Sequence, residues 1–147
     1  MFLLTYSYNN QVSAGFLNEE KTGIIPASKV LQGAENLNMI GIIEMFESIN
    51  LEELKNSIDT YKEAVKLSEV KVLPPIPYPR RNVICLGKNY LDHINEVKSL
   101  KNVNSDIPQK PIYFSKIAYP ATGHGDVVDS HSHVVGQLDY EAELAVI

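Results

Sequence analysis

The sequence is short of cysteine, of basic residues and of long hydrophobic runs, and each shortage excludes a class of protein. Its single cysteine, Cys85, permits no intramolecular disulfide and suits a reducing compartment. With 13 basic and 18 acidic residues and no basic block, the net charge of −5 disfavours nonspecific binding to nucleic acid. No apolar run approaches the roughly 20 residues of a membrane-spanning helix, and the first residues do not form a signal peptide. We therefore expect a cytoplasmic protein that binds neither nucleic acid nor membrane.

What the sequence does contain is an ordinary globular composition, with 44% hydrophobic and 21% charged residues over 147 positions. Three short β-prone runs separated by turn residues predict a small antiparallel meander, over residues 2–8, 12–17 and 22–25. Apolar residues at helical spacing then predict one helix near residues 39–49 and a second that begins after Asn50, with Glu53 as its capping-box partner. The fold class that we predict is α+β.

A run rich in proline divides the chain into two parts of different character. Residues 74–80 contain four prolines and predict a stiff connector. We expect an N-terminal α+β domain over residues 1–73, this linker over 74–80, and the start of a β-rich catalytic domain over 81–147. The apolar stripes of the two predicted helices are core contacts of the first domain.

Two glutamates near the C-terminus are the first candidates for chemistry. Residues 139–147 read as an apolar strand, in which Glu141 and Glu143 would project from the same face. Neighbouring carboxylates repel each other unless they meet a cation, share a proton or point to water. A hard divalent cation such as Mg²⁺ suits such a pair, because it prefers oxygen ligands. The alternative is a solvent-facing edge strand of alternating polarity.

A histidine and a glutamate near the start of the second part are the next candidates. Residues 83–86 predict a buried strand that ends at Gly87, and Asn89 would cap a helix starting at Tyr90. On that helix His93 and Glu96 are neighbours on one face. A carboxylate beside an imidazole raises its basicity and prepares it to take a proton from water. The alternative is a surface histidine with a chance acidic neighbour.

A strand predicted over residues 111–116 ends in Lys116, which could meet an acidic substrate or simply extend into water.

A competing metal site is also present in the pattern. His131 and His133 would share a face of an extended segment and, with His124 or Glu141, would favour Zn²⁺ over Mg²⁺. No zinc-binding framework such as a C-x-x-C or H-E-x-x-H pair lies nearby.

In this order, the motifs resemble those of the fumarylacetoacetate hydrolase family. The resemblance rests on residues 86–90 with His93 and Glu96, on 111–116 and on 139–147, and the N-terminal region is similar to that of bacterial members at residues 15–17 and 24–26. It implies an Mg²⁺ or Mn²⁺ enzyme that acts on 2-oxo acids or β-dicarbonyl compounds.

The resemblance also implies a role for each candidate residue. Glu141 and Glu143 match metal ligands, His93 and Glu96 match a catalytic dyad that activates water, and Lys116 matches a lysine that binds substrate. The expected reaction is hydrolysis of a carbon–carbon bond in an acylpyruvate or β-diketo acid, with decarboxylation, isomerisation or hydration as alternatives.

Family members continue past the E-x-E motif and supply a third acidic ligand from that continuation. We therefore expect this chain to be the N-terminal portion of a longer protein, which forms a homodimer at full length. A further alternative is a fragment without catalytic activity of its own.

Overall fold

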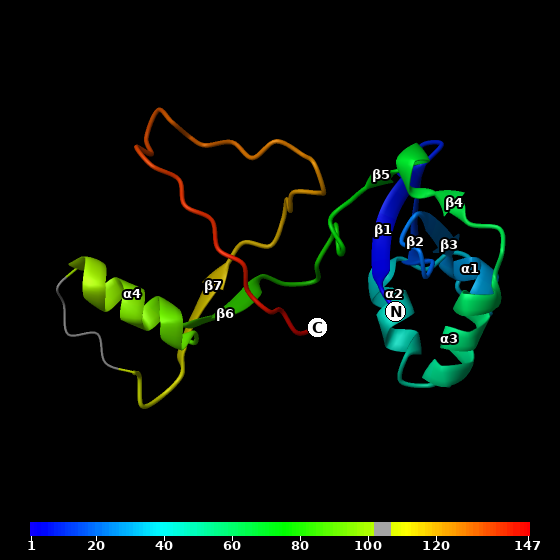
Figure 1. The fold of residues 1–147 in the computed structure, drawn as a ribbon, viewed down its shortest axis with the longest axis horizontal. Helices are drawn as coiled ribbons and strands as arrows, with labels where there is room; N and C mark the ends of the chain where they lie inside the picture. Colours follow the sequence, from blue (N-terminus) through cyan, green and yellow to red (C-terminus); the bar gives the residue numbers. More distant parts are fainter. Residues whose placement is uncertain (102–106) are drawn as a thin grey trace.

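The computed structural model describes residues 1–101 and 107–147, and it has two parts of unequal size (Figure 1). The N-terminal part is a sheet with three helices on it, and the C-terminal part is a two-stranded ribbon with one helix and long irregular segments. This mixture of helices and strands confirms the predicted α+β class. In the described part of the chain no helix is long and apolar enough to cross a membrane.

The N-terminal part is organised around a five-stranded antiparallel sheet. In spatial order its strands are β4 (Val65–Lys66), β3 (Gly23–Pro26), β2 (Gln11–Leu17), β1 (Leu3–Tyr8) and β5 (Lys71–Val72). The first three in sequence confirm the predicted meander. Asn9 and Asn10 connect β1 to β2 with positive φ angles of 49° and 63°, as a two-residue hairpin turn of type I′ requires. The short strands β4 and β5, separated by a 3₁₀ turn (Leu67–Glu69), were not predicted.

Three helices follow the meander: α1 (Ala27–Val30), α2 (Met39–Met45) and α3 (Leu51–Thr60). The last two confirm the predicted helices, and α1 is an additional single turn. The Asn50 side chain accepts hydrogen bonds from the backbone N–H groups of Glu52 and Glu53 and donates one to the Glu53 carboxylate. This arrangement resembles the predicted capping box, with asparagine as the cap, but Glu53 accepts from the Asn50 side-chain amide and not from the Asn50 backbone N–H.

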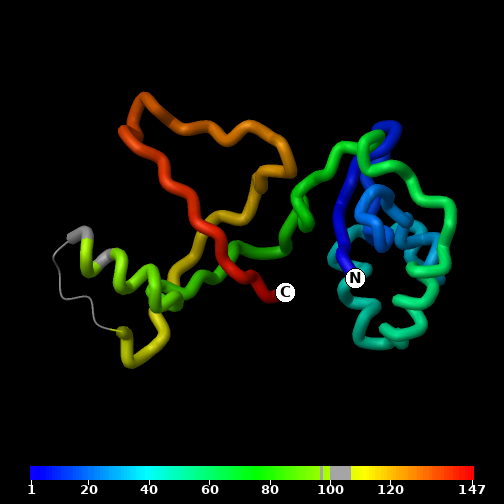
Figure 2. Tube along the Cα trace, viewed as in Figure 1, coloured from blue at the N-terminus to red at the C-terminus, as the bar shows by residue number. Residues whose placement is uncertain are grey.

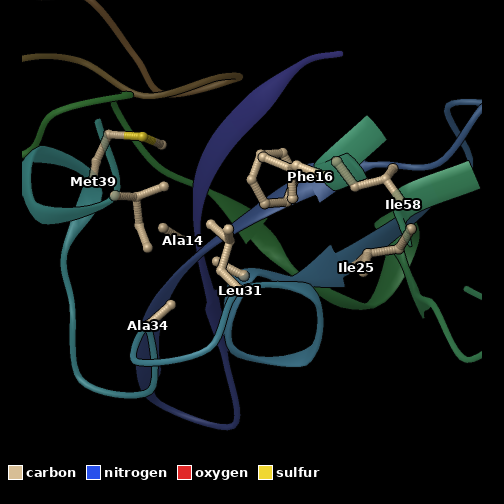
Figure 3. Packing of buried hydrophobic residues seen from close by; sticks show 10 residues of the cluster. Ala14, Phe16, Ile25, Leu31, Ala34, Met39 and Ile58 are labelled. Atoms are coloured by element: carbon tan, nitrogen blue, oxygen red, sulfur yellow. The ribbon is translucent and has the colours of Figure 1, made fainter. Parts of the chain in front are cut away.

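The two faces of the sheet bury different sets of apolar side chains. One face packs against the three helices and forms the larger cluster, whose centre Figure 3 shows: Ala14, Phe16, Ile25, Leu31, Ala34, Met39, Ile42, Leu54 and Ile58 are among its buried members. The other face carries Leu4, Tyr6 and Ile24, which residues 67–72 cover. Because side chains alternate along a strand, β1 and β3 contribute to both clusters.

The proline-rich segment is held against the N-terminal part. The backbone N–H of Leu73 donates to the Thr5 carbonyl at 2.9 Å, and the buried Thr5 hydroxyl donates to the Pro75 carbonyl at 2.6 Å. Arg80 forms an ion pair with Glu44 of α2 at 2.6 Å. The segment is therefore anchored near both of its ends, while the predicted domain limits of 1–73, 74–80 and 81–147 stay a prediction.

The C-terminal part begins with an antiparallel ribbon of β6 (Val83–Gly87) and β7 (Ile112–Lys116), and both strands are present as predicted. The prediction that residues 83–86 are buried is wrong, because within the described chain nothing packs over the ribbon and Val83, Ile84 and Leu86 are exposed. Helix α4 (Leu91–Lys101) lies between them in sequence. Both faces of the ribbon remain open, since apolar side chains on each of them are exposed: Val83, Ile84, Leu86, Ile112, Tyr113 and Phe114. After β7 the chain is irregular to its end, as the trace in Figure 2 shows.

One loop of the C-terminal part touches the N-terminal part, and we call this the loop 119–126 contact. The Lys71 ammonium lies 2.9 Å from the Asp126 carboxylate, and the rings of Tyr78 and Tyr119 stack at 5.5 Å. Gly123 fits closely here, because a Cβ atom at this position would lie 3.1 Å from the Val72 carbonyl oxygen. Strand β5 thus contacts both the sheet and this loop.

Candidate functional site

The turn between β6 and α4 forms the base of the candidate site. Lys88 follows the strand with a φ of +54°, a left-handed conformation that few residues other than glycine adopt. The Tyr90 carbonyl accepts the first helical hydrogen bond, from Ile94 N–H at 3.2 Å, so Tyr90 occupies the N-cap position. The predicted cap at Asn89 is therefore wrong by one residue, because the turn needs one more residue before the chain becomes helical.

Helix α4 presents His93 in its first turn. The His93 side chain is exposed, whereas the next residue, Ile94, is 3% exposed and anchors the helix. A fixed helix with an exposed imidazole near its start is a suitable frame for a group that exchanges protons with a bound molecule.

The segment of residues 139–147 is irregular, and its prediction as a strand is wrong. All nine residues are exposed, and within the described ranges no neighbouring strand pairs with them. A strand needs hydrogen bonds to a partner, so its apolar and β-prone composition alone does not produce one. The backbone N–H of Leu144 instead donates to the Tyr90 hydroxyl at 3.0 Å.

A pocket of about 280 Å³ lies where this segment meets the β6–α4 turn, and it contains three of the five candidate residues: His93, Glu141 and Glu143. Its remaining lining consists of Leu86, Gly87, Lys88, Asn89, Tyr90, Phe114 and Ala142. The sequence separates the histidine from the glutamates by almost fifty positions. Their meeting in one pocket is the main structural observation about function.

The other two candidates lie outside the lining of this pocket. Glu96 is exposed one helical turn beyond His93, and within the described residues no hydrogen bond or ion pair joins the two. Lys116 is at the end of β7, where its ammonium lies 5.8 Å from the centre of the Phe114 ring. Since Phe114 lines the pocket, Lys116 is two residues from it along the strand. The roles of Glu96 and Lys116 stay predictions.

The donor groups of the pocket fit a hard divalent cation in kind. Glu141 and Glu143 offer carboxylate oxygens, and Mg²⁺ is commonly bound through one or two carboxylates, with water and substrate completing its octahedron. Within the part of the chain that the structure describes, no three acidic, histidine or cysteine side chains are grouped to hold a metal. The pocket therefore provides two carboxylate ligands for a metal ion, those of Glu141 and Glu143.

The histidines of the competing zinc reading are arranged differently. The rings of His131 and His133 lie 6.2 Å apart between centres, and His131 Nδ1 is 3.4 Å from the Asp129 carboxylate. Because no third ligand joins them among the described residues, the geometry gives the zinc alternative no support.

Three pocket residues were missed as functional candidates from the sequence: Lys88, Tyr90 and Phe114. Two of them belong to the run 86–90 on which the family resemblance rests, which was a signal that the run itself lines a site. Phe114 gave no such signal, because an aromatic residue within a strand is typical of a core position.

Comparison with known proteins gives one family and several relatives. Residues 82–147 match the model of the fumarylacetoacetate hydrolase C-terminal region. The chain is 54% identical over 81 residues to oxaloacetate tautomerase YisK of Bacillus subtilis, which is 55% of this chain and 26% of that protein. It is 37% identical over 83 residues to an uncharacterized protein of Staphylococcus saprophyticus, which is 56% of this chain and 25% of that protein.

An uncharacterized protein of Staphylococcus aureus is 26% identical over 162 aligned positions, which is all of this chain and 51% of that protein. The chain therefore spans between a quarter and about half of the length of these curated relatives.

Proposed function

Because residues 82–147 belong to the fumarylacetoacetate hydrolase family, we propose that this chain is part of a divalent-metal enzyme that moves a proton on a 2-oxo dicarboxylic acid. The reaction is the keto–enol tautomerisation of oxaloacetate or of a close analogue. The observation that carries the proposal is the pocket that His93, Glu141 and Glu143 line together. The named relative, an oxaloacetate tautomerase, supports the choice of reaction and substrate.

Each side chain has a defined task in this reaction. The metal that Glu141 and Glu143 would hold, Mg²⁺ or Mn²⁺, supplies a Lewis acid for the carbonyl oxygen of the substrate. His93 moves one proton between the C2 oxygen and the neighbouring carbon C3: it takes the proton from the enol hydroxyl and delivers it to C3, or the reverse, so that no bond between carbon atoms breaks. Lys88, also in the lining, adds a positive charge that favours an anionic substrate.

A second candidate is the hydrolysis of acylpyruvates. The His93 side chain is exposed, so that water can reach it within the same pocket. In this reaction His93 removes a proton from water, and the hydroxide adds to the distal carbonyl. The bond from that carbon to the CH2 group then breaks, its electron pair leaves with the pyruvate fragment as an enolate, and His93 returns its proton to the enolate carbon. The groups that perform both reactions are the same, which is why the pocket alone favours neither.

Parallel assays on the intact protein test the proposal. With Mg²⁺ or Mn²⁺ present, we expect rapid decay of the enol form of oxaloacetate and slow cleavage of acylpyruvates. Faster cleavage than tautomerisation would favour the hydrolase instead. Equal rates with and without chelator would contradict the metal site for both reactions.

A further inference from the structure

We propose that Tyr90 is a positioning residue that holds Glu141 and Glu143 in front of His93 through its hydrogen bond to the backbone of Leu144. The inference rests on the proposed metal site and names a residue that keeps this site together. It starts from one contact that joins positions 54 apart in the sequence, Leu144 N–H to Tyr90 Oη at 3.0 Å.

The position of this hydrogen bond allows it to affect the geometry of the pocket. Tyr90 caps helix α4 three residues before His93, and Leu144 directly follows Glu143. A bond to the main chain restrains the backbone of the segment, so it limits where both carboxylates can lie. Its two ends belong to two of the elements that line the pocket, the turn before α4 and the segment 139–147.

The segment has little else to hold it. Residues 138–147 are exposed throughout, and among the described residues this is the one hydrogen bond that connects them to β6, α4 or the turn between them. A chain without packing samples many conformations, and each ordered residue costs conformational entropy. We call the hydrogen bond from Leu144 N–H to the Tyr90 hydroxyl the tether. Its removal would therefore let the carboxylates of Glu141 and Glu143 occupy many positions.

Metal binding is the property that responds most directly to such spreading. A cation that takes two carboxylates needs both at one distance and orientation, so pre-organised ligands bind it more tightly than mobile ones. The tyrosine ring also lines the pocket. Tyr90→Phe keeps this ring and removes only the hydroxyl that accepts the bond.

A matched control is available in the same segment. Tyr140 is next to Glu141 and is 92% exposed. Tyr140→Phe therefore removes an identical hydroxyl from the same part of the chain without touching the tether. Each variant removes one phenolic hydroxyl, and only the Tyr90 hydroxyl accepts the Leu144 N–H. The hydrogen-exchange readout at Leu144 therefore reports the loss of this bond directly.

The test combines amide hydrogen exchange without metal and Mn²⁺ titration by electron paramagnetic resonance, on the 147-residue chain. For Tyr90→Phe we expect faster exchange at the Leu144 amide and about 2- to 5-fold weaker Mn²⁺ binding, because an exposed hydrogen bond contributes at the low end of the usual range. The melting temperature should stay unchanged in both variants, and Tyr140→Phe should match the wild type in exchange and in Mn²⁺ affinity.

Two other outcomes have separate meanings. Equal exchange at Leu144 and equal Mn²⁺ affinity in wild type and Tyr90→Phe would overturn the positioning role and leave the proposed function intact. A wild-type chain that binds no Mn²⁺ would show that these two carboxylates alone do not hold a cation and would overturn the positioning role as stated, whatever the exchange rates are. The chelator assays on the intact protein test the proposed function separately.

Discussion

At the scale of single residues, His93 is the proposed general base of the reaction. It is the one imidazole in the lining of the pocket, and imidazole is the side chain most often used as a general base at neutral pH. The neighbouring carboxylates of Glu141 and Glu143 are better suited to hold a cation, because two like charges in one site favour a shared positive partner.

We predict that His93→Ala in the intact protein lowers kcat by about 10²–10⁴-fold, the range typical of a positioned general base. Steady-state assays with oxaloacetate and acylpyruvates measure the effect. Glu96→Gln should cost less than His93→Ala, because Glu96 lies outside the pocket lining and in its predicted role would act only through the imidazole.

His133→Ala is the control for this prediction, since it removes an imidazole that does not line the pocket. Its kcat should equal that of the wild type. Full activity in His93→Ala would exclude His93 from the mechanism, and a large loss in His133→Ala would revive the zinc alternative.

At the scale of elements, helix α3 depends on its first turn. Asn50 satisfies two backbone N–H groups that would otherwise lack partners. We predict that Asn50→Ala lowers the free energy of unfolding by about 0.5–2 kcal/mol, as measured by urea denaturation.

Asn56→Ala is the matched control on the same helix. Asn56 is exposed in the helix interior, where alanine has the higher helix propensity, so the variant should be neutral or slightly more stable. Equal losses in the two variants would show that the cap bonds are not the source of the effect.

Strand β2 depends on a glycine that has no room for a side chain. A Cβ atom on Gly15 would lie 2.7 Å from the Ile25 carbonyl oxygen and 2.8 Å from Ile24 Cγ2. Because the backbone of β3 must then move away, we predict that Gly15→Ala destabilises the N-terminal part by about 1–3 kcal/mol in urea denaturation.

The control is Gly136→Ala, since a Cβ atom there would meet nothing within 4 Å. It should leave the free energy of unfolding unchanged. A Gly15→Ala variant as stable as the wild type would mean that β2 and β3 separate easily at this point.

The elements that the sequence predicted well are those whose stabilising contacts are local. The meander followed from alternating polarity with turn residues at Asn9 and Asn10, and α3 followed from its cap at Asn50. The two-residue strands β4 and β5 were missed because each is defined only by a distant partner: Val65 pairs with Ile24, and Val72 with Tyr6.

The same difference between local and distant contacts explains the outcome at the candidate site. Residues 139–147 have the composition of a strand but no partner in the described chain, so the prediction was wrong. The grouping of His93 with Glu141 and Glu143 was expected from the family resemblance and not from spacing. Tyr90 was overlooked because a hydroxyl that accepts a backbone N–H from position 144 leaves no trace in a sequence.

At the scale of the whole molecule, the loop 119–126 contact joins the two parts through charge and stacking. The Asp126 carboxylate accepts a hydrogen bond from Lys71 and another from the backbone N–H of Gly123, and both bonds lower the pKa of Asp126 below its ordinary value. A carboxyl group whose pKa is lowered by folding stabilises the folded state above its unfolded pKa, which is near 3.9.

We therefore predict a contact that weakens in acid. The contribution of Asp126 should be complete at neutral pH and should be lost as the pH falls below about 4 and through the lowered pKa. The protection factor of the Gly123 amide, measured by hydrogen exchange across this range, should fall with pH in the wild type and should already be low at pH 7 in Asp126→Asn.

Asp129→Asn is the control, because the Asp129 carboxylate contacts His131 and not the N-terminal part. Its Gly123 protection should follow the wild-type curve. Equal protection at pH 7 in Asp126→Asn and wild type would mean that stacking of Tyr78 on Tyr119 maintains the contact without the charge.

The order of strands in the N-terminal sheet has a consequence for the time course of folding. β1 pairs with β2 across a two-residue turn, and a hairpin of this kind forms in roughly 1–10 μs. The other edge of β1 pairs with β5, which follows helix α3 in the sequence. Pairings between distant positions form slowly because the loop must close first. Until β5 arrives, β1 offers unpaired N–H and C=O groups to any other nascent chain. Two residues, Lys71 and Val72, thus end the period in which this hairpin is open to pairing with the wrong partner.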